Sequence, residues 1–311
     1  MPGEGTALIA AFCYALAYVF LRKGQSESPL PDHGLFPILS LSVLPLGSGL
    51  LLFTATGVAS IQLPAKWPYV LLYSGLSGLI GTWLGRMALY TAIDSIGATR
   101  GVVIKSMAPL VTLLIALVLL RERLDDLDTT GMICLISGVA LVFVDRSWIQ
   151  QRGRLDWLKR GFVLGIGAAV LQGIGHAMRK LATVYGVNPL LSAFFDVTTA
   201  FLAYLLWLMF TGHLKHIVRY FVKSRDSYVM AAGFLSAAGV LLFFTAVGQA
   251  PVSTVSVIIG TEPVLVAIFS SILLRKLERL TLLTAVACIL VATGVILTSL
   301  DQMPVNLRLF K

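Results

Sequence analysis

The sequence predicts an all-α integral membrane protein whose ten transmembrane helices form two inverted five-helix repeats. Three observations support this fold class. Of the 311 residues, 57% are hydrophobic and only 13% are charged, whereas about a quarter of the residues in an ordinary soluble protein are charged. The apolar residues gather in blocks close to the roughly 20 residues that a helix needs to span the hydrocarbon core. The two halves of the chain also resemble each other.

The apolar blocks follow one another along nearly the whole chain. We predict a membrane-spanning helix, numbered 1 to 10, in each of residues 6–21, 35–58, 69–93, 98–120, 129–144, 161–181, 189–211, 227–247, 252–274 and 280–300. The blocks are continuously apolar, whereas strands of membrane barrels alternate in polarity. Irregular backbone is excluded because lipid cannot satisfy its N–H and C=O groups. The first block has no basic residues before it, and Arg22 and Lys23 follow it where a signal peptide has small residues, so we expect a helix of the mature protein.

Short segments of the first half recur in the same order in the second half. The matching pairs are Arg22-Lys23 after helix 1 with Arg179-Lys180 after helix 6, Met107-Ala108-Pro109-Leu110 with Thr261-Glu262-Pro263-Val264, and Arg121-Glu122-Arg123-Leu124 with Leu277-Glu278-Arg279-Leu280. Each half holds an odd number of predicted helices, so the second half enters the membrane from the opposite side. Such inverted repeats are common in secondary transporters, with the site between the halves. We expect repeats at 1–145 and 161–300, a linker at 146–160 and a tail at 301–311.

On these motifs the chain resembles the drug/metabolite transporter superfamily, in its EamA-type branch with ten helices. The likeness rests on the Pro-centred helices 4 and 9, the Glu-containing turn after each, and the Gly-Val pair in the last helix of each half. The resemblance implies a transporter whose central cavity is lined mainly by helices 1, 3, 4, 6, 8 and 9, with helices 5 and 10 at the periphery. Small four-helix relatives carry a functional glutamate in their first helix. Helix 1 has no carboxylate here, so that role is not carried over.

Two ionisable residues inside the predicted helices are the first site candidates, because a charge in the bilayer costs about 2.5–3.5 kcal/mol on insertion scales. Glu262 lies near the middle of helix 9, before Pro263, which breaks the helix by freeing a backbone carbonyl. It can carry a proton during transport, or it can be a structural carboxylate. Lys105 lies one turn before the corresponding Pro109 of helix 4. It can hold an anionic substrate group or pair with Glu262, and such a pair would oppose proton coupling because it favours the charged carboxylate.

Two further charged residues lie in predicted helices. Arg86 in helix 3 can contact substrate, or it can bridge to Asp94 two turns later. Arg100 is expected at the membrane boundary, solvated. Asp196 in helix 7 is a third carboxylate to test as a coupling residue.

Spacing on helices 1 and 6 adds four uncharged candidates. Gln172 and His176 are four residues apart and so share a helix face. His176 can move protons near neutral pH, or it can be a hydrogen-bonded interfacial group. Tyr14 and Tyr18 have the same spacing and can line an aromatic cavity or simply pack. The glycines of helix 3 are read as packing positions that let helices approach closely; they are Gly75, Gly78, Gly81 and Gly85.

Other classes of protein are disfavoured by the motifs that the chain lacks. No metal-ligand spacing, GxSxG motif or phosphate loop appears, so we expect neither an enzyme nor a cofactor. The three cysteines fall inside predicted helices and are read as small buried side chains. The net charge of +9 is assigned to anionic lipid headgroups rather than to nucleic acid. The stretch 212–226, with Leu214, Ile217, Val218 and Phe221 among basic residues, suits an interfacial amphipathic helix.

The sequence therefore favours a carrier in the cell membrane of a bacterium or archaeon. A proton-coupled exporter of small metabolites or drugs is favoured by Glu262, and an exchanger of anionic metabolites such as sugar phosphates is favoured by Lys105, Arg86 and Arg100. A passive channel is disfavoured because no ring of charge or filter appears. The connections on one side carry about twice as many Lys and Arg as the other side, which places both termini outside. The family resemblance implies both termini inside. The oligomeric state is open between a monomer and a homodimer.

Overall fold

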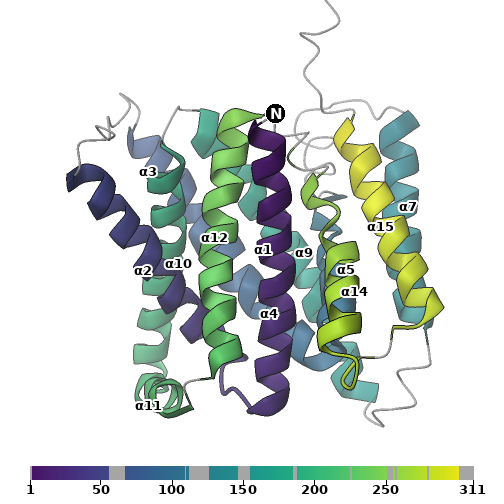
Figure 1. Ribbon diagram of the computed structural model, residues 1–311, viewed down its shortest axis with the longest axis horizontal. Helices are drawn as coiled ribbons and strands as arrows, with labels where there is room; N and C mark the ends of the chain where they lie inside the picture. The colour runs from purple at the N-terminus through teal and green to yellow at the C-terminus, as the bar shows by residue number, and fades with distance from the viewer. Residues whose placement is uncertain are drawn as a thin grey trace, which may run out of the picture.

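The computed structural model describes residues 2–55, 67–108, 110–111, 126–145, 155–184, 188–224, 226–250, 255, 258–278 and 280–300. Within these ranges the regular structure is helical and includes no strand. The long helices stand side by side in one bundle (Figure 1). Pro109 and the predicted tail lie outside the described residues.

The described helices follow the predicted blocks. In the first half they are α1 (Pro2–Glu27), α2 (Leu35–Ala55), α3 (Trp67–Ser77), the π-helical segment η1 (Gly78–Leu84), α4 (Gly85–Ile96), α5 (Ala98–Lys105) and α7 (Asp126–Val144). In the second half they are α9 (Leu155–Val184), α10 (Pro189–Phe210), α11 (Leu214–Ser224), α12 (Ser227–Gln249), α14 (Glu262–Leu273) and α15 (Leu282–Leu300).

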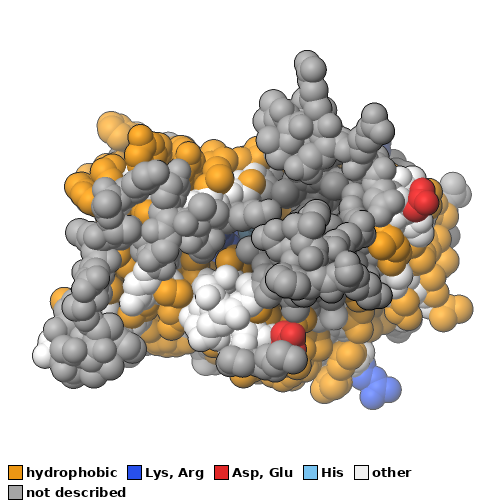
Figure 2. Space-filling model, turned by 90° about the horizontal axis from the view of Figure 1, so that it is seen from above, with side chains coloured by type: hydrophobic (Ala, Val, Ile, Leu, Met, Phe, Trp, Pro, Cys, Tyr) orange, Lys and Arg blue, Asp and Glu red, His pale blue; other side chains and the backbone are white. Residues whose placement is uncertain are grey.

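The length and polarity of these helices agree with a membrane protein. Five of the described helices are long and apolar enough to cross a membrane, and three shorter ones are also apolar. Hydrophobic side chains cover much of the rim of the molecule seen end-on (Figure 2). On α10 the exposed large hydrophobic side chains are Leu202, Leu206, Trp207, Met209 and Phe210. The predicted number of ten helices is not confirmed, because η1 interrupts helix 3 and parts of helices 4 and 9 lie outside the described residues.

Two arginines of the repeat, one expected after helix 1 and one at the end of the apolar block 161–181, lie inside helices. Arg22 belongs to α1 and Arg179 belongs to α9, and both are buried. The helices extend past the apolar blocks because polar partners inside the bundle receive these side chains. Arg100 is also buried, against the expectation of a solvated boundary residue.

Predicted helices 4 and 9 are each interrupted at matching positions of the repeat. α5 ends at Lys105 and is followed by a turn at Ser106 and Met107. α14 begins at Glu262 after a turn at Gly260 and Thr261. Glu262 therefore lies at the start of a helix rather than near the middle of one. Its neighbour Pro263 is in the first turn, where a missing backbone N–H breaks no helical hydrogen bond.

Three of the four glycines of helix 3, Gly78, Gly81 and Gly85, lie at close contacts between helices, as predicted, whereas a Cβ added at Gly75 would make only ordinary contacts with Thr199 at 3.8–3.9 Å. A Cβ added at Gly78 would lie 2.1 Å from the carbonyl oxygen of Asp196 on α10, and one at Gly81 would lie 2.9 Å from the Cα of Gly175 on α9. These contacts bring α3, η1 and α4 against α9 and α10. π-helical segments inside α-helices are frequent at functional sites.

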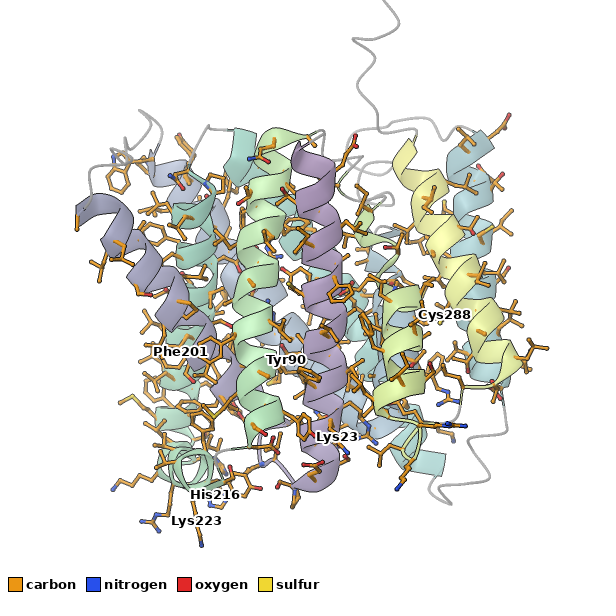
Figure 3. All side chains as sticks on the ribbon, viewed as in Figure 1. Lys23, Tyr90, Phe201, His216, Lys223 and Cys288 are labelled. Carbon is orange, nitrogen blue, oxygen red and sulfur yellow. The ribbon has the colours of Figure 1, made fainter. Side chains whose placement is uncertain are left out.

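Two elements lie at the margins of the bundle. α7 packs along α15 at one end of the row of helices (Figure 1), at the periphery as the resemblance implied. α11 lies across the long helices, and its Leu214, Ile217, Val218 and Phe221 pack on the core. Lys223 points away from the bundle (Figure 3). The stretch 212–226 thus contains an amphipathic helix, as predicted.

Replacement of Gly78 by alanine is expected to destabilise the protein, because the new Cβ would clash with the carbonyl oxygen of Asp196. Overpacking costs about 1–3 kcal/mol, and each kcal/mol lowers the unfolding temperature by about 2–4 °C in a chain of moderate size. Gly167→Ala on α9 is the matched control, because its Cβ meets nothing within 4 Å. Equal unfolding temperatures of the two variants in detergent micelles would contradict the close contact.

Candidate functional site

A cavity lies inside the bundle and receives side chains from both halves. Its lining residues are Tyr14, Tyr18, Gly81, Arg86, Lys105, Gln172, His176, Arg179, Phe243, Ile259 and Glu262. They belong to predicted helices 1, 3, 4, 6, 8 and 9, which are the helices that the resemblance placed around a cavity. All the predicted site residues within the described ranges line it except Asp196 and Pro263.

The centre of the cavity wall is an ion pair between the two halves. Lys105 Nζ donates to Glu262 Oε2 at 2.6 Å, and both side chains are buried. Lys105 is in the last turn of α5 and Glu262 is in the first turn of α14. The helix dipole favours a cation at a C-terminus and an anion at an N-terminus. Each charge is therefore stabilised both by its partner and by the helix end that carries it.

Aromatic rings surround this pair. The rings of Tyr14 and Tyr18 are stacked with centroids 6.4 Å apart, and Lys105 Nζ lies 5.4 Å from the Tyr18 centroid. His176 stacks on Phe243 at 5.9 Å. Gln172 donates to the backbone oxygen of Gly85. The spacing of four residues on helices 1 and 6 thus placed each pair on the cavity side.

Arg86 points into the cavity and does not bridge to Asp94, one of the two alternatives considered for it. Its Nη1 donates to Ser236 Oγ at 2.7 Å, and the side chain is buried. Asp94 is bound instead by Arg22 at 3.2 Å and by His33 at 3.0 Å. Arg86 and Asp94 lie eight residues apart on α4 and contact different neighbours, so they form no ion pair with each other.

Asp196 is fully buried behind the cavity, as the anion of a polar cluster. It pairs with Arg179 Nη2 at 3.1 Å and accepts hydrogen bonds from Ser77 at 2.5 Å and Thr82 at 2.6 Å. Ser77 and Thr82 lie at and within the π-helical segment. Arg179 also faces the rings of Phe243 and Phe244. Asp196 is therefore joined to the cavity wall through Arg179, a residue that our reading of the sequence did not propose for the site.

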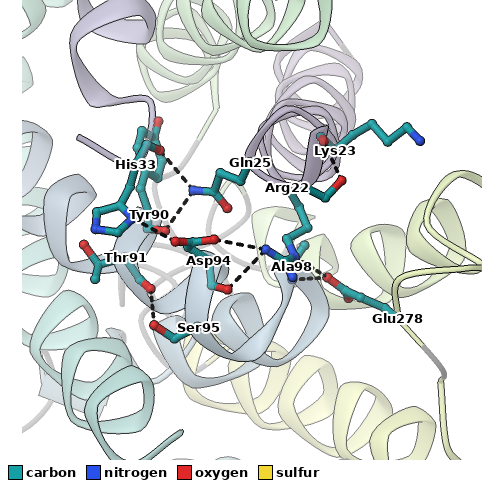
Figure 4. A network of polar contacts seen from close by, with 11 residues as sticks. Arg22, Lys23, Gln25, His33, Tyr90, Thr91, Asp94, Ser95, Ala98 and Glu278 are labelled. Atoms are coloured by element: carbon teal, nitrogen blue, oxygen red, sulfur yellow. Dashed lines mark hydrogen bonds and ion pairs between the residues drawn. The ribbon is translucent and has the colours of Figure 1, made fainter. Parts of the chain in front are cut away.

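A polar network joins the two halves at the end of the bundle where α11 lies (Figures 3 and 4). Glu278 accepts from the backbone N–H of Ala98 at 2.6 Å and from that of Thr99 at 3.3 Å. Arg22 lies between Glu278 and Asp94, 3.5 Å and 3.2 Å away. Gly97 makes the cap possible, because its φ of 94° suits glycine and a Cβ there would lie 2.8 Å from Glu278 Oε1.

A second polar group lies beside this network. Asp145, which follows α7, lies 3.8 Å from Arg100 Nη2 and accepts from the hydroxyls of Thr281 and Thr284 near the start of α15. Glu278 and both threonines belong to the second half, and their partners belong to the first. The Glu278 and Asp145 groups thus link the two halves at one end of the bundle, in addition to the polar contacts at the cavity.

The described residues offer no group of three or more His, Cys, Asp and Glu side chains that could hold a metal ion. Cys13, Cys134 and Cys288 are free thiols, and Cys13 and Cys288 are buried. The lining residues of the cavity offer ion pairs, hydrogen bonds and aromatic faces.

Comparison with known proteins agrees with this geometry. The model of the EamA-like transporter family matches residues 1–144 and residues 159–300. The chain belongs to the EamA-like transporter family. This EamA-like protein is also similar to a solved structure titled only "Crystal structure of protein", with a TM-score of 0.58, 17% identity and 98% of each chain covered. That likeness concerns the fold alone. No curated protein sequence matches the chain.

Membership of the family gives the general role of the protein. The protein is a multi-pass integral membrane protein that transports small molecules, and its family is one of transporters rather than enzymes. Since the cavity is lined by both halves and holds ionisable groups shielded from lipid, it is the candidate site for the transported molecule.

Asp196→Asn is expected to destabilise this EamA-like transporter strongly, because it leaves the buried Arg179 without its counter-ion. Breaking a buried pair by removing one partner costs about 3–5 kcal/mol. Glu27→Gln is the control, because Glu27 forms an exposed pair with Lys23, and such pairs contribute about 0–1 kcal/mol. Thermal unfolding measures both. A loss at Asp196 no larger than that at Glu27 would show that the cluster does not stabilise the fold.

Proposed function

We propose that the protein is a secondary active transporter that moves a small metabolite by alternating access, with the central cavity as the substrate site. The observation that carries this proposal is the Lys105–Glu262 pair, which joins the broken helices of the two halves inside the cavity. Discontinuous helices whose ends face a site between repeats are typical of secondary transporters. A site built from both halves changes its accessibility when one half moves against the other.

The pattern of helix packing supports two related halves. α1 packs on α12, which are predicted helices 1 and 8, and α4 packs on α9, which are predicted helices 3 and 6. The repeat relates helix 1 to helix 6 and helix 3 to helix 8, so exchanging the two repeats turns the pair of helices 1 and 8 into the pair of helices 6 and 3. α7 and α15 are predicted helices 5 and 10, which exchange with each other, so their pair is unchanged. This arrangement is the one expected of the inverted repeat and suits rocking of one half against the other.

The network around Glu278 supports a role as the gate at the α11 end. It links the first half through Arg22, Ala98 and Thr99 to the second half through Glu278. These contacts must break if the halves separate at that end. Hydrogen bonds to charged groups contribute about 1.5–3 kcal/mol each, so the network favours closure at that end.

Two modes of coupling fit the cavity. An exchanger of anionic metabolites is favoured by the three cations of the cavity wall, which are Arg86, Lys105 and Arg179. A proton-coupled exporter is favoured by Glu262 Oε1, a buried oxygen without a hydrogen-bond partner in the described part of the chain. Substrate flux and proton flux measured together distinguish the two modes.

Glu262→Gln is expected to reduce substrate flux in proteoliposomes by at least about tenfold, the effect of losing roughly 1.4 kcal/mol at the limiting step. Substrate-driven proton movement that this variant abolishes would support the exporter. Flux that needs a counter-substrate and moves no protons would support the exchanger. Glu27→Gln controls for loss of a carboxylate elsewhere. Undiminished flux in Glu262→Gln would contradict the assigned role of the pair.

Glu278→Gln is expected to open the α11 end, because it weakens the contacts to Arg22 and to the start of α5. A thiol introduced by Ile259→Cys in the cavity wall, in a variant whose three native cysteines are replaced by alanine, reports this opening. Its labelling from the α11 side by a membrane-impermeant reagent should accelerate at least about tenfold, as a shift of 1.4 kcal/mol between two states predicts. Unchanged labelling would contradict the gate.

A further inference from the structure

The cavity and the cluster behind it contain more positive than negative charge. Arg86, Lys105 and Arg179 all line the cavity. The carboxylates in contact with them are Glu262, which pairs with Lys105, and Asp196, which pairs with Arg179. Within the described residues Arg86 is the cation of the cavity wall that forms no ion pair with a carboxylate, and Asp196 attracts it only from a greater distance.

The surroundings of Arg86 are polar but neutral. Its guanidinium donates to the Ser236 hydroxyl at 2.7 Å and lies beside the Tyr90 hydroxyl. A buried ion pays a desolvation cost of several kcal/mol that neutral hydrogen bonds offset only in part. An anion that enters the cavity can supply the missing charge. A guanidinium binds a carboxylate or phosphate through two parallel hydrogen bonds.

Glu262 supplies a second group for recognition. Its Oε2 accepts from Lys105, while Oε1 has no hydrogen-bond partner in the described part of the chain, although the side chain is almost completely buried. Buried polar atoms are nearly always hydrogen-bonded. A hydroxyl or ammonium group on the substrate can donate to this oxygen.

The remaining walls restrict the body of the substrate. The rings of Tyr14, Tyr18, His176 and Phe243 form most of the uncharged lining. The cavity therefore suits a small organic molecule with an apolar or aromatic body.

We propose that the substrate is a small organic anion that binds Arg86 through one carboxylate or phosphate group and donates a hydrogen bond to Glu262 Oε1. This proposal rests on the proposed function, because it takes the cavity to be the transport site. Arg86 is the specificity-determining residue for the anionic group. Lys105 and Arg179 stay paired and position the walls of the cavity.

The test is thermal unfolding of the purified full chain with matched probes at constant ionic strength. The anions are lactate, mandelate and glycerol 3-phosphate, and their neutral counterparts are lactamide, mandelamide and glycerol. At about 20 mM, at least one anion should raise the unfolding temperature by about 2 °C or more, as mass action predicts for a millimolar site. Its neutral counterpart should not. A response to mandelate or lactate identifies a carboxylate, and a response to glycerol 3-phosphate identifies a phosphate.

Variants locate the effect at Arg86. Arg86→Gln should abolish the shift, and Arg86→Lys, which keeps the charge but loses the paired donors, should reduce it. Arg219→Gln is the control, because Arg219 is exposed on α11 and its loss should leave the shift unchanged. If Arg86→Gln does not fold, Arg86→Lys and the comparison of anions with neutral probes decide the question.

Three results would overturn the proposal: no anion stabilises the protein, a neutral counterpart stabilises it equally, or the shift persists in Arg86→Gln. Failure of the proposed function gives a different result. Anion binding at Arg86 without flux of any substrate in proteoliposomes would refute the proposed transport function, and the proposed anion site would remain supported. Flux of a neutral or cationic substrate that depends on Glu262 would refute the proposal of an anionic substrate, and the proposed transport function would remain supported.

Discussion

The ion pair between Lys105 and Glu262 is the interaction on which the rest of the site depends. Each charge is buried, and removal of such groups from water costs several kcal/mol per ion. A contact of 2.6 Å offsets part of that cost, and the ends of α5 and α14 offset more. The pair requires both helices to end at the cavity. It therefore depends on the helix breaks at Ser106-Met107 and at Gly260-Thr261. The two halves therefore meet at a point where charge, backbone geometry and cavity coincide.

The other buried charges are arranged around this pair at increasing distance from the cavity. Arg179 lines the cavity and is neutralised from behind by Asp196. At the α11 end, Arg22 is neutralised by Asp94 and Glu278. Glu278 also caps α5, so this helix carries a carboxylate at its start and Lys105 at its end. A displacement of α5 thus changes the contacts of the gate and of the cavity together, which provides a physical route for coupling between them.

The sequence predicts much of the cavity because charged residues inside apolar blocks are rare and costly. Glu262, Lys105 and Arg86 were identified on that ground, and the i, i+4 spacing identified Tyr14 with Tyr18 and Gln172 with His176. Their positions in the structure follow from helix geometry, which sequence spacing describes well. The fold class was predicted for the same reason, since length and polarity alone distinguish a membrane helix.

The sequence did not lead us to predict that charged side chains near the ends of helices are buried. Arg22 and Arg179 stand where an apolar block gives way to polar residues, so they resembled interfacial charges. Their burial depends on partners far away in the sequence, Glu278 and Asp196. A signal was nevertheless present, since Arg22 is four residues after Tyr18, and Arg179 is three residues after His176 on the cavity side of its helix. We predicted that Pro263 breaks helix 9. In the structure the break comes earlier, at Gly260 and Thr261, and Pro263 lies in the first turn of α14.

A double-mutant cycle on Lys105→Met and Glu262→Gln tests the central claim most directly. Thermal or denaturant unfolding of the wild type, both single variants and the double variant gives the interaction energy between the two side chains. The account predicts that each single variant is destabilised and that the double variant is more stable than the sum of the two losses implies, with a coupling of about 1–3 kcal/mol. Additive losses would show that the two residues act independently, and would contradict a site organised around their ion pair.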